Sequence, residues 1–211
     1  MTVPAVNCQA VTKIFRHPFS RLEIEALREI SFEIDQGDFV CVLGRNGSGK
    51  STLLRIIAGI ARPSEGKIFV FGQDPRAYQC RRQIGYMPEK SQFYLDVSAE
   101  TFLNYIAKLH KIISPEKNVL YTIELVGLKK WAQIQIKTYS VGMKQRLALA
   151  SALIHSPQLI LLDEPMANID KEGKKTMQEL LTTLIDEKRT VIVATHDTQL
   201  TARANRCVNL E

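Results

Sequence analysis

Residues 44–51 combine three glycines with a lysine and a hydroxyl side chain, in the order Gly44-Arg45-Asn46-Gly47-Ser48-Gly49-Lys50-Ser51. Glycines let a backbone turn tightly and come close to a phosphate without a Cβ in the way, and the N–H groups of the loop then point at the anion. Lys50 supplies positive charge to terminal phosphates, and Ser51 offers a hydroxyl to Mg²⁺. A glycine, four residues and then Gly-Lys-Ser is the pattern of a phosphate-binding P-loop, and the alternative is a glycine-rich turn without a ligand. The residues expected to contact a nucleotide here are Gly44, Asn46, Gly47, Ser48, Gly49, Lys50, Ser51 and Thr52.

Two acidic residues, Asp163 and Glu164, follow a run of four apolar residues at 159–162. The run is expected to be a buried strand, and the carboxylates stand at its C-terminal end, where α/β sheets bind ligands. We expect Asp163 to hold Mg²⁺ through water and Glu164 to polarise the attacking water, because phosphoryl transfer depends mostly on positioning. Helix-capping acids give the same local pattern, so this interpretation depends on the P-loop upstream.

A histidine follows the next apolar run. Thr195-His196-Asp197 comes directly after residues 191–194, which are expected to form a strand beside the one at 159–162. Both strands would end at the same edge of the sheet, so a contact between His196 and the γ-phosphate is favoured over a structural or solvated histidine. The other three histidines, His17, His110 and His155, have no comparable context and are given no role.

The elements that must position these residues alternate between strand and helix, which predicts a parallel α/β sheet. The expected strands cover residues 6–15, 30–34, 39–43, 67–71, 159–162, 191–194 and 207–210. Helices are expected over 51–58 and 171–188 and near Gln199. The middle of the chain reads differently: helices starting at Ser98, Pro115 and Val141 predict a helical lobe inserted into the core, and the spacing of Phe102, Ile106, Leu109 and Ile113 places them on one helix. Residues 16–27 are expected to form a basic surface loop.

Composition limits the classes of protein that remain. A chain of 211 residues holds one substantial domain with an inserted lobe rather than two independent domains. The longest apolar runs have strand length, far below the roughly 18 to 20 residues that cross a bilayer, and the N-terminus lacks secretory-signal features. A net charge of +6 suits a polyanionic ligand or an anionic membrane surface, and no direct nucleic-acid binding is expected. The four cysteines show no Cys-x-x-Cys spacing, which favours buried, reduced thiols over a metal site or a disulfide framework.

Taken together, the motifs resemble those of the ATP-binding subunits of ABC transporters, over essentially the whole chain and in the family's order. Residues 138–146, Thr-Tyr-Ser-Val-Gly-Met-Lys-Gln-Arg, resemble the ABC signature. The resemblance implies that Ser140 and Gly142 contact the γ-phosphate of ATP held by the opposite subunit, although this stretch taken alone would be only an N-capped helix.

Other positions match the family one at a time. Phe15 resembles the aromatic residue that stacks on adenine, with a core phenylalanine as the alternative. Residues 167–170 resemble the D-loop, which implies that Asp170 crosses a dimer interface, and His196 matches the switch histidine. Residues 86–89, Tyr-Met-Pro-Glu, fall at the Q-loop that joins the core to the helical lobe, so Glu89 is expected near Mg²⁺ or water.

The resemblance implies a RecA-like P-loop NTPase core with an N-terminal antiparallel β portion and an inserted α-helical lobe. The whole chain would be one ABC ATPase domain, with its core at 1–88 and 156–211 and its lobe at 89–155. The implied activity is hydrolysis of ATP with Mg²⁺, by two subunits in a homodimer or pseudo-dimer. The implied partner is an integral membrane permease, and the implied location is the cytoplasmic face of the cell membrane.

The sequence also departs from the family pattern. Glu89 replaces the usual glutamine, and Val141 and Met143 replace a glycine and a glutamine, which predicts altered coupling and is more similar to exporters than to importers. The short chain is similar to the ATPase of the cytochrome c maturation haem exporter. The alternative function is a non-transport ABC ATPase that powers a cell-envelope or cell-division membrane complex. DNA-repair and ribosomal ABC ATPases fit this length poorly, and an enzyme that phosphorylates a small substrate would have no use for the signature helix.

Overall fold

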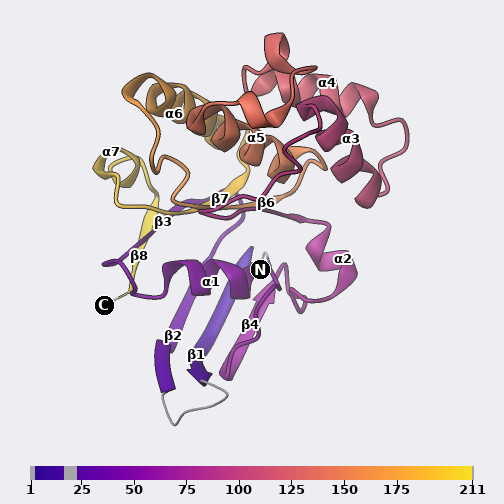
Figure 1. The fold of residues 1–211 in the computed structure, drawn as a ribbon. Coiled ribbons are helices and arrows are strands. Elements are labelled where there is room, and N and C mark those ends of the chain that lie inside the picture. Colours follow the sequence, from indigo (N-terminus) through magenta and orange to yellow (C-terminus); the bar gives the residue numbers. More distant parts are fainter. Residues whose placement is uncertain (1–2, 17–22, 211) are drawn as a thin grey trace.

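The computed structural model describes residues 3–16 and 23–210, which form two β-sheets with helices packed around them (Figure 1). The larger sheet is parallel, with the strand order β5-β6-β7-β3-β8. Its strands are β5 (Ile84–Met87), β6 (Leu159–Asp163), β7 (Thr190–Ala194), β3 (Phe39–Leu43) and β8 (Arg206–Asn209). The smaller sheet is antiparallel, with the order β2-β1-β4, and consists of β1 (Val6–Arg16), β2 (Glu23–Ile34) and β4 (Glu65–Val70). This architecture confirms the predicted fold class.

The parallel sheet is covered on both faces, which is why its central strands are apolar throughout. Val40 and Val42 of β3 face a core that they share with α1 (Lys50–Ile57) and the antiparallel sheet. Phe39 and Cys41 face the opposite side, toward α5 (Val141–Leu153) and α6 (Lys171–Asp186). Polar residues at the C-terminal ends of β3, β6 and β7 therefore lie at one edge of the sheet.

A third apolar cluster joins the helices of the middle segment, α3 (Ala99–Leu109), α4 (Glu116–Leu125) and α5, which lie together in Figure 1. The expected N-cap is confirmed, because the Ser98 hydroxyl accepts a hydrogen bond from the backbone N–H of Thr101 at 3.2 Å. Short 3-10 turns at Lys129–Trp131 and Ile136–Thr138 lead into α5. The boundaries of the predicted lobe, at residues 89 and 155, stay a prediction.

The segment at 16–27 is not a surface loop where the structure describes it. Strand β1 continues to Arg16, and β2 begins at Glu23, where the two side chains form an ion pair with 2.8 Å between Nε and Oε1. Antiparallel pairing with β1 extends through Leu27, so the ladder continues well beyond the strand expected from the apolar alternation at 30–34. Residues 17–22, including His17, lie outside the described residues.

Two further expectations are wrong, and two elements were missed. Helix α3 ends at Leu109, and Lys111 and Ser114 adopt left-handed backbone conformations, so Ile113 is 92% exposed instead of packed. Cys207 is exposed, because β8 is an edge strand, whereas the other three thiols are buried as expected. The missed elements are β5 and α2 (Tyr78–Arg81), each only four residues long. The short helix predicted near Gln199 is present as α7 (Thr198–Thr201). Among the described residues, no helix has the length and apolar character to cross a membrane.

Candidate functional site

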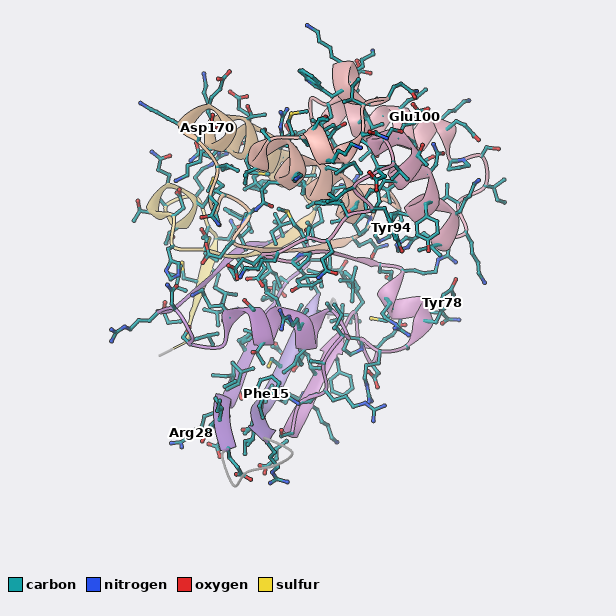
Figure 2. The ribbon with its side chains drawn as sticks, in the orientation of Figure 1. Phe15, Arg28, Tyr78, Tyr94, Glu100 and Asp170 are labelled. Atoms are coloured by element: carbon teal, nitrogen blue, oxygen red, sulfur yellow. The ribbon has the colours of Figure 1, made fainter. Side chains whose placement is uncertain are left out.

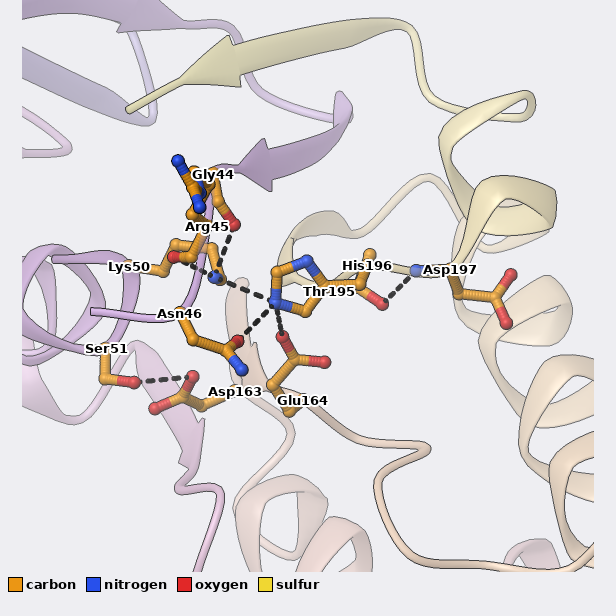
Figure 3. A network of polar contacts seen from close by, with 10 residues as sticks. All are labelled: Gly44, Arg45, Asn46, Lys50, Ser51, Asp163, Glu164, Thr195, His196 and Asp197. Carbon is orange, nitrogen blue, oxygen red and sulfur yellow. Dashed lines mark hydrogen bonds and ion pairs between the residues drawn. The ribbon is translucent and has the colours of Figure 1, made fainter. Parts of the chain in front are cut away.

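The glycine-rich loop connects the end of β3 to the start of α1, as the sequence predicts. Lys50 is the first residue of α1, and its ammonium donates hydrogen bonds to the carbonyl oxygens of Gly44 at 2.7 Å and Arg45 at 3.1 Å (Figure 3). The N-cap of α1 is Gly49, which has no side chain to accept from the first N–H groups of the helix. A helix N-terminus with open N–H groups and a lysine beside it is an anion-binding arrangement.

Gly49 cannot be replaced without moving the neighbouring strand. Its φ of 94° lies in the left-handed region, and a Cβ built on it would stand 2.1 Å from the carbonyl oxygen of Ala26 in β2. Gly47 also has a positive φ of 85°, but a Cβ there would meet no atom of the described residues within 4 Å. Glycine is thus required at position 49 by both conformation and space, and at position 47 by conformation alone.

Ser51 and Asp163 meet across the junction of α1 and β6. The Ser51 hydroxyl donates to Oδ1 of Asp163 at 3.0 Å, while Oδ2 is buried without a hydrogen-bond partner among the described residues. Burial raises the pKa of Asp163, the nearby Glu89 carboxylate acts in the same direction, and the Ser51 hydrogen bond opposes them. A buried carboxylate oxygen without a partner, next to a hydroxyl, fits the oxygen ligands that Mg²⁺ prefers. Two of the three residues predicted at the metal site, Ser51 and Asp163, are therefore brought together.

Glu164 and His196 lie side by side at the ends of the adjacent strands β6 and β7. The Nε2 atom of His196 is 3.3 Å from Oε1 of Glu164, 3.0 Å from Oδ1 of Asn46 and 3.1 Å from Nζ of Lys50 (Figure 3). When Nε2 carries the proton it donates to the Asn46 or Glu164 oxygen, and when it does not it accepts from Lys50. Burial raises the pKa of Glu164, as does charge repulsion from Asp163 and Glu89, while His196 and Lys50 lower it.

These side chains surround a cavity of about 580 Å³ at the carboxyl edge of the parallel sheet. Its lining includes most of the residues predicted from the sequence, together with Ala26, Ala167 and Asn168. A second cavity of about 790 Å³ shares Ala26, Asn46 and Gly47 with the first and extends along β2 toward Leu210. The sequence analysis missed Ala26 because its segment was expected to be a loop. The apolar residues at every second position, Ile24 and Ala26, were a signal for a strand.

Seven predicted residues do not line this cavity. Gly44 and Asp163 contact its lining residues Lys50 and Ser51, and Ser48 lines the second cavity, whereas the other four lie elsewhere. Ser140 is exposed at the start of α5, where its hydroxyl accepts from the Met143 N–H at 3.2 Å, and Gly142 is the second residue of that helix. Asp170 caps α6 by accepting from the Gly173 N–H at 3.0 Å and is exposed. In Figure 2 Asp170 lies far from Phe15, which is on the antiparallel sheet.

Phe15 is not a core residue. It is 45% exposed at the end of β1, and the Lys13 ammonium lies 5.0 Å from the centroid of its ring. The core alternative is therefore wrong, and stacking of Phe15 on adenine stays a prediction.

Comparison with known proteins agrees with this geometry. A family profile described as ABC transporter matches residues 27–167. An uncharacterised ABC transporter ATP-binding protein of Synechocystis sp. is 36% identical over 90% of this chain and 55% of its own length. The bacitracin transport ATP-binding protein BcrA of Bacillus licheniformis is 35% identical over 82% of this chain and 57% of its own length. This chain thus spans a little over half the length of these two relatives.

A third relative and the solved structures match over more of their length. The energy-coupling factor transporter ATP-binding protein EcfA2 of Thermotoga maritima is 34% identical over 93% of this chain and 74% of its own length. A dimeric ATP-binding cassette solved in a post-hydrolysis state with ADP and Pi superposes with a TM-score of 0.89, at 26% identity, over 98% of this chain and 94% of that one. This chain belongs to the ABC transporter family of ATP-binding domains.

Proposed function

We propose that this chain binds ATP with Mg²⁺ and hydrolyses it as one of two paired subunits. The observation that carries the proposal is the cluster at the carboxyl edge of the sheet. The Ser51–Asp163 pair lies there beside His196, which contacts both Lys50 and Glu164. A P-loop alone indicates only that a phosphate is bound. Carboxylates in these two positions add a metal ligand and a group that can orient water.

Each residue has a distinct task in this proposal. Lys50 and the N–H groups at the start of α1 bind the β- and γ-phosphates. Ser51 and Asp163 would hold Mg²⁺, with Glu89 nearby, and the ion neutralises phosphate charge when bound. Glu164 accepts a hydrogen bond from the attacking water and orients it, and its raised pKa makes it a stronger base than a solvated glutamate. His196 contacts the γ-phosphate from the adjacent strand.

We propose that a second subunit completes the site. Ser140 is exposed and outside the cavity that contains Lys50, so it serves a nucleotide only if that nucleotide belongs to another chain. The similar cassette with ADP and Pi was solved as a dimer, which supports this arrangement. In it, Ser140 and Gly142 of one subunit would contact the ATP of the other, Asp170 would cross the interface, and Phe15 would stack on adenine.

We further propose that the dimer drives an integral membrane permease from the cytoplasmic face of the membrane. Relatives named for bacitracin transport and for an energy-coupling factor transporter support a role in transport. Export is the proposed direction, on the basis of Glu89, Val141 and Met143. The likeness to the haem-exporter ATPase stays a prediction, and the membrane protein that co-purifies with this chain would identify the cargo.

The substitution Glu164→Gln tests the proposed base. It removes the carboxylate and preserves size, so ATP binding should persist while the hydrolysis rate falls about 100-fold or more, as for loss of a general base. Unhydrolysed ATP should then hold two subunits together, and size-exclusion chromatography with ATP would detect the dimer. Glu172→Gln, an exposed acid in the first turn of α6, is the matched control and should hydrolyse ATP normally. Hydrolysis by Glu164→Gln at the rate of the control would contradict the assignment.

A further inference from the structure

Two polar side chains beside the Ser51–Asp163 pair, Arg55 and Tyr86, have no role in the function proposed above. Together with Ser51 and Asp163 they form a small polar cluster. Ser51 and Arg55 stand one turn apart on α1, so they face the same part of the sheet. Tyr86 of β5 is opposite Leu161 of β6, two residues before Asp163. Side chains two residues apart on a strand share a face, so Tyr86, Leu161 and Asp163 all point toward α1. Tyr86 packs there against the apolar core between the sheet and α1.

Two atoms of this cluster are complementary and unpaired. The hydroxyl of Tyr86 and Oδ2 of Asp163 are both buried, and neither has a hydrogen-bond partner among the described residues. They are close enough to influence each other: burial raises the pKa of Tyr86, the Asp163 carboxylate raises it further, and Arg55 lowers it. Buried polar groups are rarely left unsatisfied, and here a donor and an acceptor on adjacent strands are both unsatisfied.

We propose that Tyr86 is a positioning residue for Asp163, donating its hydroxyl proton to Oδ2 when Mg²⁺ and nucleotide are bound. The inference rests on the proposed function, because it concerns the same metal site. A carboxylate has about four acceptor positions, so hydrogen bonds from Ser51 to Oδ1 and from Tyr86 to Oδ2 leave room for the ion or its water. Arg55 can donate to the same tyrosine oxygen and fix its orientation.

The role predicts a specific pattern of defects. Groups that hydrogen-bond to a metal-binding carboxylate typically contribute 10- to 100-fold to metal affinity or activity. Tyr86→Phe removes only the hydroxyl and keeps the packed ring. Because that hydroxyl is buried without a partner among the described residues, its loss should not lower the stability without Mg²⁺. The loss of a hydroxyl with only a structural role would lower the stability without Mg²⁺ and leave the Mg²⁺ requirement unchanged.

The experiment compares three measurements for the full chain and for Tyr86→Phe. These are the Mg²⁺ concentration for half-maximal ATP hydrolysis, ATP binding in EDTA by calorimetry, and the urea midpoint without metal. We expect the Mg²⁺ requirement to rise about tenfold or more, ATP binding in EDTA to stay the same, and the urea midpoint not to fall. Thr190→Val is the control, since the Thr190 hydroxyl, at the start of β7 and away from the site, accepts a hydrogen bond from the Gly37 N–H at 2.9 Å. It should lower the urea midpoint and leave the Mg²⁺ requirement unchanged.

The outcomes separate this inference from the proposed function. If Tyr86→Phe needs no more Mg²⁺ than the wild type while Asp163→Asn loses Mg²⁺-dependent hydrolysis, the inference fails and the proposed function stands. If Tyr86→Phe lowers the metal-free urea midpoint as Thr190→Val does, the hydroxyl is structural and the inference also fails. If the wild type itself hydrolyses ATP without any dependence on Mg²⁺, the proposed function fails.

Discussion

His155 makes the stability of this protein depend on pH in a way that can be worked out from its surroundings. It follows α5, and its Nε2 lies 3.1 Å from the Ile84 carbonyl oxygen, while its ring stacks on that of His110 with 3.9 Å between centroids and 10° between planes. The Nδ1 atom is buried without a partner among the described residues. Burial, with the neighbouring His110 and Arg82 acting in the same direction, lowers the pKa of His155 from 6.5 to about 4.

The sign of the effect follows from linkage. Because the pKa in the folded state lies below that in the unfolded state, the unfolded chain binds more protons between these two values. The contribution of His155 is therefore fully present above about pH 6.5 and is lost as the pH falls toward about 4. With 1.36 kcal/mol per pKa unit, the loss between about pH 7 and pH 5 is about 2 kcal/mol. That is a large part of a typical free energy of unfolding.

The test compares the wild type with His155→Gln, whose amide can still donate to the Ile84 carbonyl but does not titrate. Urea unfolding followed by circular dichroism at about pH 7 and pH 5 gives the free energy of unfolding at each. We expect the wild type to lose about 2 kcal/mol more than the variant on acidification. The raised pKa values of Asp163 and Glu164 act with the opposite sign, favouring the folded state as the pH falls, and they cancel in this difference. Equal pH dependence in the two proteins would refute the reasoning.

Two further predictions concern packing and thiol exposure. A Cβ at Gly85 would lie 2.2 Å from the Ala152 carbonyl oxygen and 2.8 Å from Cγ of Pro157, so Gly85→Ala should lower the free energy of unfolding by about 1–3 kcal/mol in urea titration. A variant as stable as the wild type would mean that β5 and α5 do not pack this closely. Of the four cysteines, only Cys207 should react rapidly with a maleimide before unfolding, because the others are buried and their pKa values are raised. Rapid labelling of a Cys207→Ser variant would contradict this.

The arrangement of the candidate site could be predicted from the sequence because its parts are local. The glycine spacing before Lys50 and the apolar run before Asp163 each combine a strand end with a polar residue. Strand ends of a parallel sheet meet at one edge, so the proximity of Glu164 to His196 followed without any knowledge of the exact strand order. The helix starts at Ser98 and Ser140 were likewise visible, since a capping side chain acts within one turn.

What the sequence did not reveal depends on pairing between distant segments. Strand β5 has only four residues and is defined by its ladder with β6, which lies more than 70 residues later in the chain. The neighbouring positions of Cys41 and Cys207 on β3 and β8, and the approach of Tyr86 to Asp163, arise in the same way. No local pattern encodes such contacts, because each strand is compatible with several neighbours.

Asp163 and Glu164 raise a geometric question, because consecutive residues of a strand point to opposite faces of the sheet. Asp163 is the last residue of β6 and faces α1, where Ser51 holds it. Continued as a strand, Glu164 would turn toward α5 and α6, away from the phosphate site. Instead its backbone adopts a left-handed conformation with φ of 48°, which ends the strand and lets its carboxylate reach His196. Such a conformation is unfavourable for a glutamate by about 1 kcal/mol or more, and it persists where the surrounding structure enforces it. The left-handed residue therefore lets two adjacent carboxylates point to different partners, Asp163 to Ser51 and Glu164 to His196, which fits the separate roles proposed for them at the metal and at the water.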